Sequence, residues 1–204
     1  MNILKYIKLL LFNKIKNESK KSLNFKSFNL KNNIFKVEGK DNKIDIEKYS
    51  KIKNSKIFLK GNNIKLKIER NVKILDSFIE IYGNNNLVII GENTSFAGVR
   101  MTSAEEDNAI KIGKNCLFSY NIEIRNTDSH KIYQKGKHIN KGKEIIINDN
   151  VWICEGVTIL KGVEIGKGNI VGIKSVVNKS ITKENCIFIG NPIRCVKEEI
   201  SWER

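Results

Sequence analysis

The chain has few residues that hold metals, and they are not spaced as a metal site requires. It contains 4 cysteines and 2 histidines in 204 residues, and no two cysteines form a Cys-x-x-Cys pair. Zinc sites need thiolate or imidazole ligands at such short, regular spacings. The sequence therefore predicts no metal site. We also expect a cytoplasmic protein with reduced thiols.

A long hydrophobic run is also missing. The opening MNILKYIKLLLFNKIK is interrupted by lysines and has no small-residue cleavage site, so we expect neither a secretory signal nor a membrane span. We predict that residues 1–30 form a separate basic amphipathic segment with a short helix. That helix either packs on the protein or lies on an anionic membrane through residues 1–16. The apolar side of the helix comprises Ile3, Leu4, Ile7, Leu10, Leu11 and Ile15.

Two further absences limit what the positive charge can mean. The formal net charge is +15, and a basic surface attracts nucleic acid, phosphorylated cofactors, acidic polysaccharides or membranes. No Walker-type phosphate loop is present, which gives no support to nucleotide hydrolysis. No nucleic-acid-binding module or aromatic ribonucleoprotein pattern is present, so we expect no nucleic-acid partner.

What the sequence does have is a six-residue repeat between Ile145 and Val177. Neither a helix, with a period of 3.6, nor a simple strand, with a period of 2, gives this spacing. It is typical of a β-solenoid in which each hexad makes one short strand and one turn, and three hexads close a triangular coil. The repeated aliphatic residues are Ile147, Ile153, Ile159, Ile165, Val171 and Val177, and glycines recur at Gly156, Gly162 and Gly168.

Earlier in the chain a wider repeat of 22 residues is present. Its strands alternate apolar and lysine residues, as in Ile64–Ile68, which predicts side chains pointing inward and outward in turn. We predict wider coils of the same solenoid, one β-helix domain over residues 31–198, and a tail at 199–204. The glycines that mark the wider repeat are Gly39, Gly61 and Gly83.

Two stretches break the repeats. Residues 125–144 are polar and contain both histidines, and a polar excursion from a rigid scaffold is where functional sites tend to lie. We predict an extended loop there. The second stretch, Ser103–Asn108, is predicted to be a solvated acidic loop that contains Glu105, Glu106 and Asp107.

Four segments carry a resemblance to a known family. These are Thr127–His130, Val151–Ile153, Ser175–Val177 and Gly190–Pro192. Together with the hexads they resemble the hexapeptide-repeat acyltransferases, and most of all the bacterial capsule and lipopolysaccharide O-acetyltransferases, including those that act on sialic acid polymers. The resemblance implies a left-handed parallel β-helix, a homotrimer, and acetyl-CoA as the co-substrate.

The resemblance also implies roles for residues of the loop. His130 matches the histidine of the family's Asp-x-His motif and is expected to be the general base, for which a neutral imidazole is suited. Asp128 is the second catalytic candidate, as a residue that orients the loop or the imidazole. Asn126 and Ser129 are candidates for shaping the loop and binding the acceptor. His138 has no counterpart in the motif and is expected at the surface.

The remaining candidate residues lie in the C-terminal half. Trp152 follows an inward valine, so it should point outward, where it serves trimer packing, a wall of the acceptor cleft, or both. By position, the resemblance implies coenzyme A contacts from Gly172, Ile173, Lys174, Asn178, Lys179, Arg194 and Lys197.

These observations favour an acetyl-CoA-dependent O-acetyltransferase. The basic charge predicts an acidic acceptor, such as a sialic acid-containing capsule or lipooligosaccharide. Two enzymatic alternatives stay open: an N-acetyltransferase acting on an amino sugar nucleotide, and an O-acetyltransferase for a small acceptor. The non-enzymatic alternative is a β-solenoid scaffold.

Overall fold

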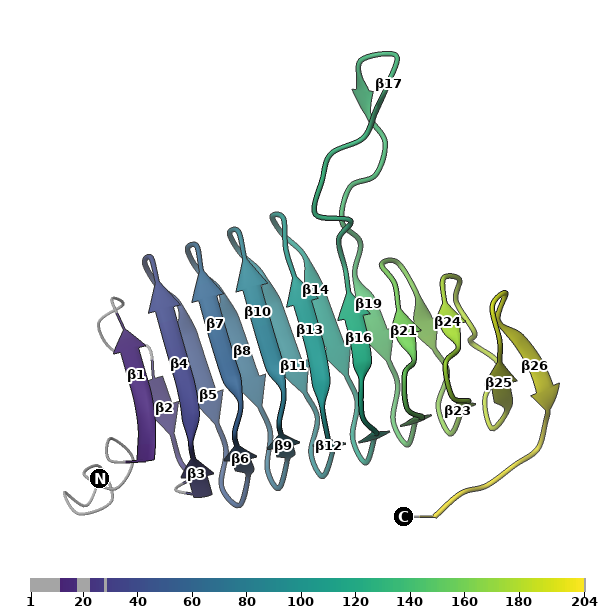
Figure 1. Cartoon of the computed structure of the whole chain (residues 1–204), viewed down its shortest axis with the longest axis horizontal. Coiled ribbons are helices and arrows are strands. Elements are labelled where there is room, and N and C mark those ends of the chain that lie inside the picture. Colours follow the sequence, from purple (N-terminus) through teal and green to yellow (C-terminus); the bar gives the residue numbers. More distant parts are fainter. Residues whose placement is uncertain (1–11, 18–22, 28, 204) are drawn as a thin grey trace.

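The computed structural model describes residues 12–17, 23–27 and 29–203, and these form an all-β solenoid whose coils stack along one axis (Figure 1). Each coil contributes one strand to each of three sheets, which form the faces of a prism. The first sheet contains β1 (Asn13–Asn17), β4 (Asn33–Glu38), β7 (Lys56–Lys60), β10 (Phe78–Tyr82), β13 (Val99–Ser103), β16 (Ile122–Arg125), β21 (Thr158–Ile159) and β24 (Val176–Val177).

The other two sheets follow the same order. The second contains β2 (Leu23–Phe25), β5 (Lys43–Ile46), β8 (Lys65–Ile68), β11 (Leu87–Ile90), β14 (Ala109–Ile112), β19 (Ile145–Ile147) and β22 (Glu164–Ile165). The third contains β3 (Asn29–Lys31), β6 (Lys51–Lys53), β9 (Lys73–Leu75), β12 (Ser95–Phe96), β15 (Leu117–Phe118), β20 (Trp152–Ile153), β23 (Ile170–Val171), β25 (Ile187–Ile189) and β26 (Arg194–Lys197). Within these three sheets all neighbouring strands are parallel except β25 and β26.

Both predicted repeats are confirmed by the strand register. In the wide coils, Phe78 pairs with Lys56 on one side and with Arg100 on the other, each 22 positions away. Beyond residue 145 the coils narrow, and Thr158 pairs with Val176, 18 positions away, which is three hexads. Each residue therefore lies above its equivalent in the preceding coil.

The core is a column of aliphatic side chains inside the prism. The six hexad residues from Ile147 to Val177 are all at most 1% exposed, as predicted. The small residues that follow them are buried too, including Asn169 and Ser175. Asn169 does not leave its amide unpaired, because its Nδ2 donates to the Lys183 carbonyl oxygen at 2.7 Å and its Oδ1 accepts from the Cys186 N–H at 2.8 Å. Buried polar groups are tolerated when they are paired in this way.

The corner between the first and second sheets is a ladder of asparagines. Asn63 donates to Asn85 at 2.9 Å, and Asn85 donates to Asp107 at 2.9 Å, each step rising one coil. All three have positive φ angles, which asparagine and aspartate tolerate better than most residues. Asp107 is exposed, as predicted, but it also continues this ladder.

The start of the chain differs from the prediction. Asn13–Asn17 form β1, a strand paired in parallel with β4, so the predicted helix is wrong for these residues. The alternating pattern of NKIKN lets Ile15 turn toward the core while the lysines point away, and strand pairing overrides the helical periodicity. The rest of the predicted helix, residues 1–11, lies outside the described residues.

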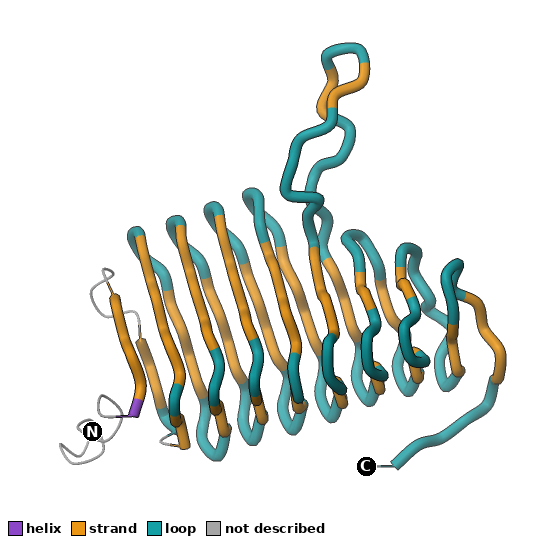
Figure 2. Tube along the Cα trace, viewed as in Figure 1, coloured by secondary structure: helices purple, strands orange, loops and turns teal. Residues whose placement is uncertain are grey.

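The chain ends in a segment that folds back along the third sheet. After β26, the Ile200 N–H donates to the Asn185 carbonyl oxygen at 2.9 Å, and Trp202 Nε1 donates to the Asn150 carbonyl oxygen at 3.0 Å. Figure 2 shows this tail and the short turns that join the strands from β3 onward, except at one long excursion. No helix in the described part of the chain is long and apolar enough to cross a membrane.

The close stacking of coils predicts a strong effect of one added methyl group. A Cβ on Gly61, whose φ is +144°, would lie 1.8 Å from the Gly83 carbonyl oxygen. We expect Gly61→Ala to lower the free energy of unfolding by about 1–3 kcal/mol, as overpacking does. Gly136→Ala is the control, because Gly136 also has a positive φ but a Cβ there has nothing within 4 Å. Equal denaturation midpoints for the two variants would contradict this account.

Candidate functional site

The one long excursion rises from the corner between the first and second sheets. The chain leaves the solenoid after β16 and returns at β19. At its tip, β17 (Tyr133–Gln134) and β18 (Lys137–His138) form an antiparallel hairpin that projects above the body of the prism (Figure 1). This confirms the predicted loop at residues 125–144 and places both histidines in it.

Hydrogen bonds from buried polar groups hold the base of this loop in place. Asn126 is fully buried, donates from Nδ2 to Ser103 Oγ at 2.8 Å, and accepts at Oδ1 from the Ala104 N–H at 2.9 Å. Asn108 Nδ2 approaches the Asn126 carbonyl oxygen at 3.4 Å. Asn126 therefore shapes the base of the loop, and its side chain is not on the surface.

Glu105 ties the two arms of the loop together. Thr127 Oγ1, on the outgoing arm, donates to Glu105 Oε1 at 2.8 Å, and the Gly142 N–H, on the returning arm, donates to Glu105 Oε2 at 2.8 Å. The prediction of a solvated side chain is wrong for Glu105. The 22-residue repeat contained the signal, because Gly61, Gly83, Glu105 and Thr127 occupy equivalent positions in successive coils.

A second set of contacts holds the middle of the loop. The Asp128 carboxylate forms an ion pair with Lys161, from the next coil, and accepts from Asn140 Nδ2 at 2.9 Å. The hydrogen bond from the Lys161 ammonium, assisted by that from Asn140, holds the pKa of Asp128 below its usual range. Lys161 also donates to the Asn140 carbonyl oxygen at 2.8 Å. Asp128 therefore orients the loop, and the sequence did not reveal its two partners.

His130 combines a fixed backbone with an exposed side chain. Its N–H donates to the Asp128 carbonyl oxygen at 2.8 Å, and its carbonyl oxygen accepts from Asn140 Nδ2 at 2.8 Å. Within the residues that the structure describes, the imidazole has no hydrogen-bond partner, so it is open to groups from outside the chain. His138 is half-buried in the hairpin, with Nε2 3.0 Å from Asn140 Oδ1 and its ring 5.6 Å from that of Tyr133.

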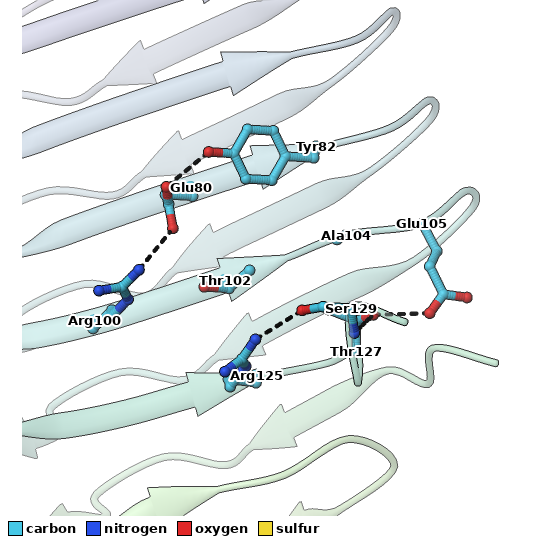
Figure 3. A pocket seen from close by; sticks show the side chains of 9 residues that line it. All are labelled: Glu80, Tyr82, Arg100, Thr102, Ala104, Glu105, Arg125, Thr127 and Ser129. Carbon is cyan, nitrogen blue, oxygen red and sulfur yellow. Dashed lines mark hydrogen bonds and ion pairs between the residues drawn. The ribbon is translucent and has the colours of Figure 1, made fainter. Parts of the chain in front are cut away.

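A groove lies beside the loop on the outer face of the first sheet (Figure 3). It has a volume of about 430 Å³ and contains two guanidinium groups, those of Arg100 and Arg125. Arg125 donates to Ser129 Oγ at 2.8 Å, which connects the groove to the residue before His130. The lining residues are Glu80, Tyr82, Arg100, Thr102, Ala104, Glu105, Arg125, Thr127 and Ser129.

The acidic groups of this groove are already engaged. Glu80 accepts from the Tyr82 hydroxyl at 2.7 Å and lies 3.5 Å from Arg100 Nη2. Burial and the neighbouring Glu80 carboxylate raise the pKa of Tyr82 to about 12, so it stays a donor. Glu105 is occupied by the loop. Arg125 in turn lies 3.7 Å from Glu123, so each arginine has one carboxylate neighbour. A guanidinium group has five N–H donors, and the donors that remain on these two arginines, which the sequence did not identify, are the groups suited to bind an anion.

Trp152 and His130 lie on opposite sides of the prism. It lies on β20 in the third sheet, opposite the corner from which the loop rises, between Leu117 and Ile170 of the adjacent coils. The ring of Trp202 covers it at 5.9 Å. Its Nε1 is buried and has no hydrogen-bond partner among the described residues. One chain therefore does not bring Trp152 and His130 together.

The predicted coenzyme A residues divide between two corners. Gly172, Ile173 and Lys174 form the turn between β23 and β24, where the Ile173 side chain is 62% exposed. Arg194 lies at the same corner, because it pairs with Ile189, whose side chain borders Gly172. The exposed Asn178 and Lys179 follow β24 at the corner that carries the loop, and Lys197 pairs with Ile187 on the third sheet.

The cysteines and other ligand-type residues are dispersed. All four cysteines are free, and burial raises the pKa of the Cys116 thiol to about 12, as suits a small core residue. Across residues 12–17, 23–27 and 29–203, no group of three or more His, Cys, Asp or Glu is placed to hold a metal ion.

The Glu105 clamp gives a testable prediction. Glu105→Ala removes both contacts, so we expect amide hydrogen exchange in residues 126–142 to become faster by at least tenfold, while the strands of the first sheet keep their protection. Glu105→Gln is the matched control, since its amide can accept from Gly142 and donate to Thr127. If the two variants exchanged alike, the clamp would not be what orders the loop.

The Asp128 contacts predict a pH dependence of the loop. Since the folded pKa is held below that of the unfolded chain, the ordering contribution is complete above the usual aspartate range and is lost as the pH falls through the folded pKa. We expect amide protection of residues 128–140 to decrease in that acidic window in the wild type. Asp128→Asn should show lower protection at neutral pH and no such acidic transition.

Comparison with known proteins identifies the family. The polysialic acid O-acetyltransferase OatWY has 37% identity, a TM-score of 0.86, and a match that covers 94% of this chain and 90% of that protein. The polySia-specific acetyltransferase NeuO has 28% identity, a TM-score of 0.83, and coverage of 95% and 83%. No protein-family model and no curated protein matches the chain.

The match to OatWY spans nearly the full length of both proteins, and the fold is the stacked parallel solenoid that the hexads predicted. The chain therefore belongs to the hexapeptide-repeat β-helix family and is an acetyl-CoA-dependent O-acetyltransferase.

Proposed function

We propose that this enzyme acetylates a hydroxyl group of an acidic capsule polysaccharide of the polysialic acid type. The observation that carries the proposal is the position of His130, whose exposed imidazole follows Ser129 at the edge of a groove with two arginines. The two similar proteins act on polysialic acid, according to their names. A polymer with one carboxylate per sugar matches the basic character of the chain, whose net charge is +15.

In this proposal His130 acts as the general base. The imidazole takes the proton of the acceptor hydroxyl as its oxygen attacks the thioester carbon of acetyl-CoA. The C–O bond forms, the C–S bond breaks, and the imidazolium returns the proton to the departing thiolate of coenzyme A. The contacts of Asn140 to the His130 backbone support this role because they fix the loop while leaving the ring free.

The acceptor carboxylate is assigned to the groove. Arg100 and Arg125 present planar guanidinium groups, which bind carboxylates with paired hydrogen bonds. Arg100 also lies over the Phe78 ring, with its guanidinium carbon 5.4 Å from the ring centroid, a contact that limits the movement of the group. Ser129, held by Arg125, is placed to contact the same sugar.

We further infer a homotrimer with its sites between subunits. The loop with His130 and the face with Trp152 lie on opposite sides of the prism, so one site can contain both only if they come from different subunits. Trp152 keeps part of its surface exposed in one chain, which supports a role for this face in contacting another molecule. In a closed ring of identical subunits, the His130 loop of each subunit meets the Trp152 face of the next, so every interface contains both.

The same family membership implies a left-handed solenoid. In Figure 1 the strands of the first sheet rise along the near side, those of the second descend behind, and the stack advances toward the C-terminus, which agrees with that hand. Coenzyme A is assigned to the narrow C-terminal coils. There the exposed turn Gly172–Lys174 and Arg194 share one corner and offer backbone groups and a cation for its phosphates.

The acetyl donor and the free cysteine thiols support a cytoplasmic location for the enzyme. Acetyl-CoA is a cytoplasmic metabolite, and all four cysteines are free. The predicted membrane contact through residues 1–16 falls mainly outside the described residues and stays a prediction.

Removal of the base tests the reaction. We expect His130→Ala to lower kcat for acetyl transfer to polysialic acid by about 10²–10⁴-fold, the usual contribution of a general base, with coenzyme A affinity unchanged. Product mass and free thiol release measure the reaction. His138→Ala is the control in the same loop. Near-normal turnover by His130→Ala would remove its assigned role.

Mixing two variants tests the shared site. Co-expressed His130→Ala and Trp152→Ala chains, each inactive alone, should form mixed trimers in which some interfaces have both residues intact. With equal amounts, about one quarter of the sites are intact, so about one quarter of wild-type activity should return. No recovery in mixed trimers, confirmed by differential tags, would contradict a site built from two subunits.

A further inference from the structure

The third sheet carries a cluster of lysines at its N-terminal end, on the side of the prism opposite the hairpin (Figure 1). Lys31, Lys51, Lys53 and Lys73 point outward, because the residues between them, such as Ile52 and Ile74, are buried in the core. The strand register stacks them, with Lys51 beside Lys73 and Lys31 beside Lys53. Like charges directly opposite on adjacent strands are destabilising, so this arrangement has an energetic cost.

The acidic residues around this cluster do not neutralise it. Three of them border the preceding corner, and each is paired with another cation, in the pairs Glu47–Lys26, Glu69–Lys67 and Glu92–Arg70. At the following corner, Asp76 accepts from Asn54 Nδ2 at 3.0 Å. In the described part of the chain none of the four lysines forms a salt bridge. Asp76, which forms no salt bridge with a described residue, is one carboxylate beside four lysines, so the face keeps a net positive charge.

An unusual tyrosine lies beside the cluster. Tyr49 stands two residues before Lys51 with φ of 66°, at the corner where later coils place Asn71, Asn93 and Asn115, with φ of 57°, 62° and 56°. Asparagine tolerates this left-handed conformation, whereas a bulky side chain is strained in it. Packing against the rest of the protein does not explain the tyrosine, because 73% of its surface is exposed. A strained, exposed aromatic residue is a signal of binding, and its flat ring suits a sugar.

The cluster is aligned with the proposed acceptor cleft. The outward row that contains Lys51 and Lys73 continues through Ser95 and Leu117 to Trp152, one residue per coil. At about 4.8 Å per coil, Lys73 lies roughly 15 Å from Trp152 along the face. A linear polymer that enters the cleft at Trp152 has a straight path along this row to the lysines.

We propose that Tyr49, Lys31, Lys51, Lys53 and Lys73 form a second binding site for the acidic polysaccharide, separate from the groove at the transfer site. It holds a stretch of polymer several sugars away from the sugar that is acetylated. The proposal rests on the proposed function for the identity of the polymer. Its consequence is a preference for long acceptors, because only these reach both the cleft and the lysines.

Binding of fluorescently labelled polysialic acid, without acetyl-CoA, tests this site directly. Lys51→Gln/Lys73→Gln should raise the Kd for long polymer severalfold and reduce the salt dependence of binding. Lys43→Gln/Lys65→Gln is the matched control, because these two exposed lysines also stack across adjacent coils and form no salt bridge with any described residue, but lie on the second sheet. It should bind like the wild type. Equal loss in the two double variants, or loss in neither, would overturn the proposal.

Tyr49→Asn separates binding from folding. Asparagine is the residue that the next coils have at this corner, and it tolerates the positive φ better than tyrosine. The thermal midpoint of unfolding should therefore rise while polymer binding weakens. A rise in midpoint with unchanged binding would remove Tyr49 from the site. A merely destabilising substitution cannot imitate the expected result, because stability and affinity move in opposite directions.

Acetyl transfer to polymers of graded length distinguishes this proposal from the proposed function. The wild type should have a lower KM for long chains than for trimers of sialic acid, and this ratio should shrink in Lys51→Gln/Lys73→Gln. Lysine-dependent binding without any acetyl transfer would support the second site and refute the proposed reaction. Transfer with equal KM for long and short chains would support the reaction and refute the second site.

Discussion

Every feature of this enzyme depends on the in-register hydrogen bonding between successive coils. Because parallel neighbours pair residue for residue, an inward residue lies above an inward residue, and a one-residue slip in a strand would turn its apolar set outward. The same register places Glu105 one coil before Thr127, and Asp107 one coil after Asn85 in the asparagine ladder. Core, corners and loop anchors are thus positioned by one constraint.

The sequence predicted the features that the repeat determines, namely the coils, the core and the loop. It did not predict side-chain contacts between residues that the repeat does not relate. The hexads identified the buried residues, and their interruption identified the loop with His130. The Glu105–Thr127 contact follows the 22-residue repeat, but the Glu105–Gly142 contact and the Asp128–Lys161 pair match no repeat spacing, so the sequence pattern does not reveal them. Asn13–Asn17 was misassigned for a related reason. Its apolar spacing fits a helix, and only pairing with β4 makes it a strand.

The loop has a fixed backbone and an exposed imidazole, that of His130. Its base is fixed by buried amides and a carboxylate, its middle by an ion pair, and its backbone at His130 by Asn140, yet the imidazole is left open. Such preorganisation lets a base meet its substrate without reordering the loop. The geometry of the prism separates His130, the proposed base, from Trp152, so the proposed mechanism requires the assembly of subunits.

The change of coil size along the stack gives the enzyme a modular end. The wide coils repeat every 22 residues with equivalent pairing, whereas the loop and the turns assigned to coenzyme A belong to the coils after Val99. Duplication or loss of one wide coil would keep the register of everything downstream. Gene variation at this end would therefore lengthen or shorten the protein in steps of about 4.8 Å and leave the chemistry of transfer untouched.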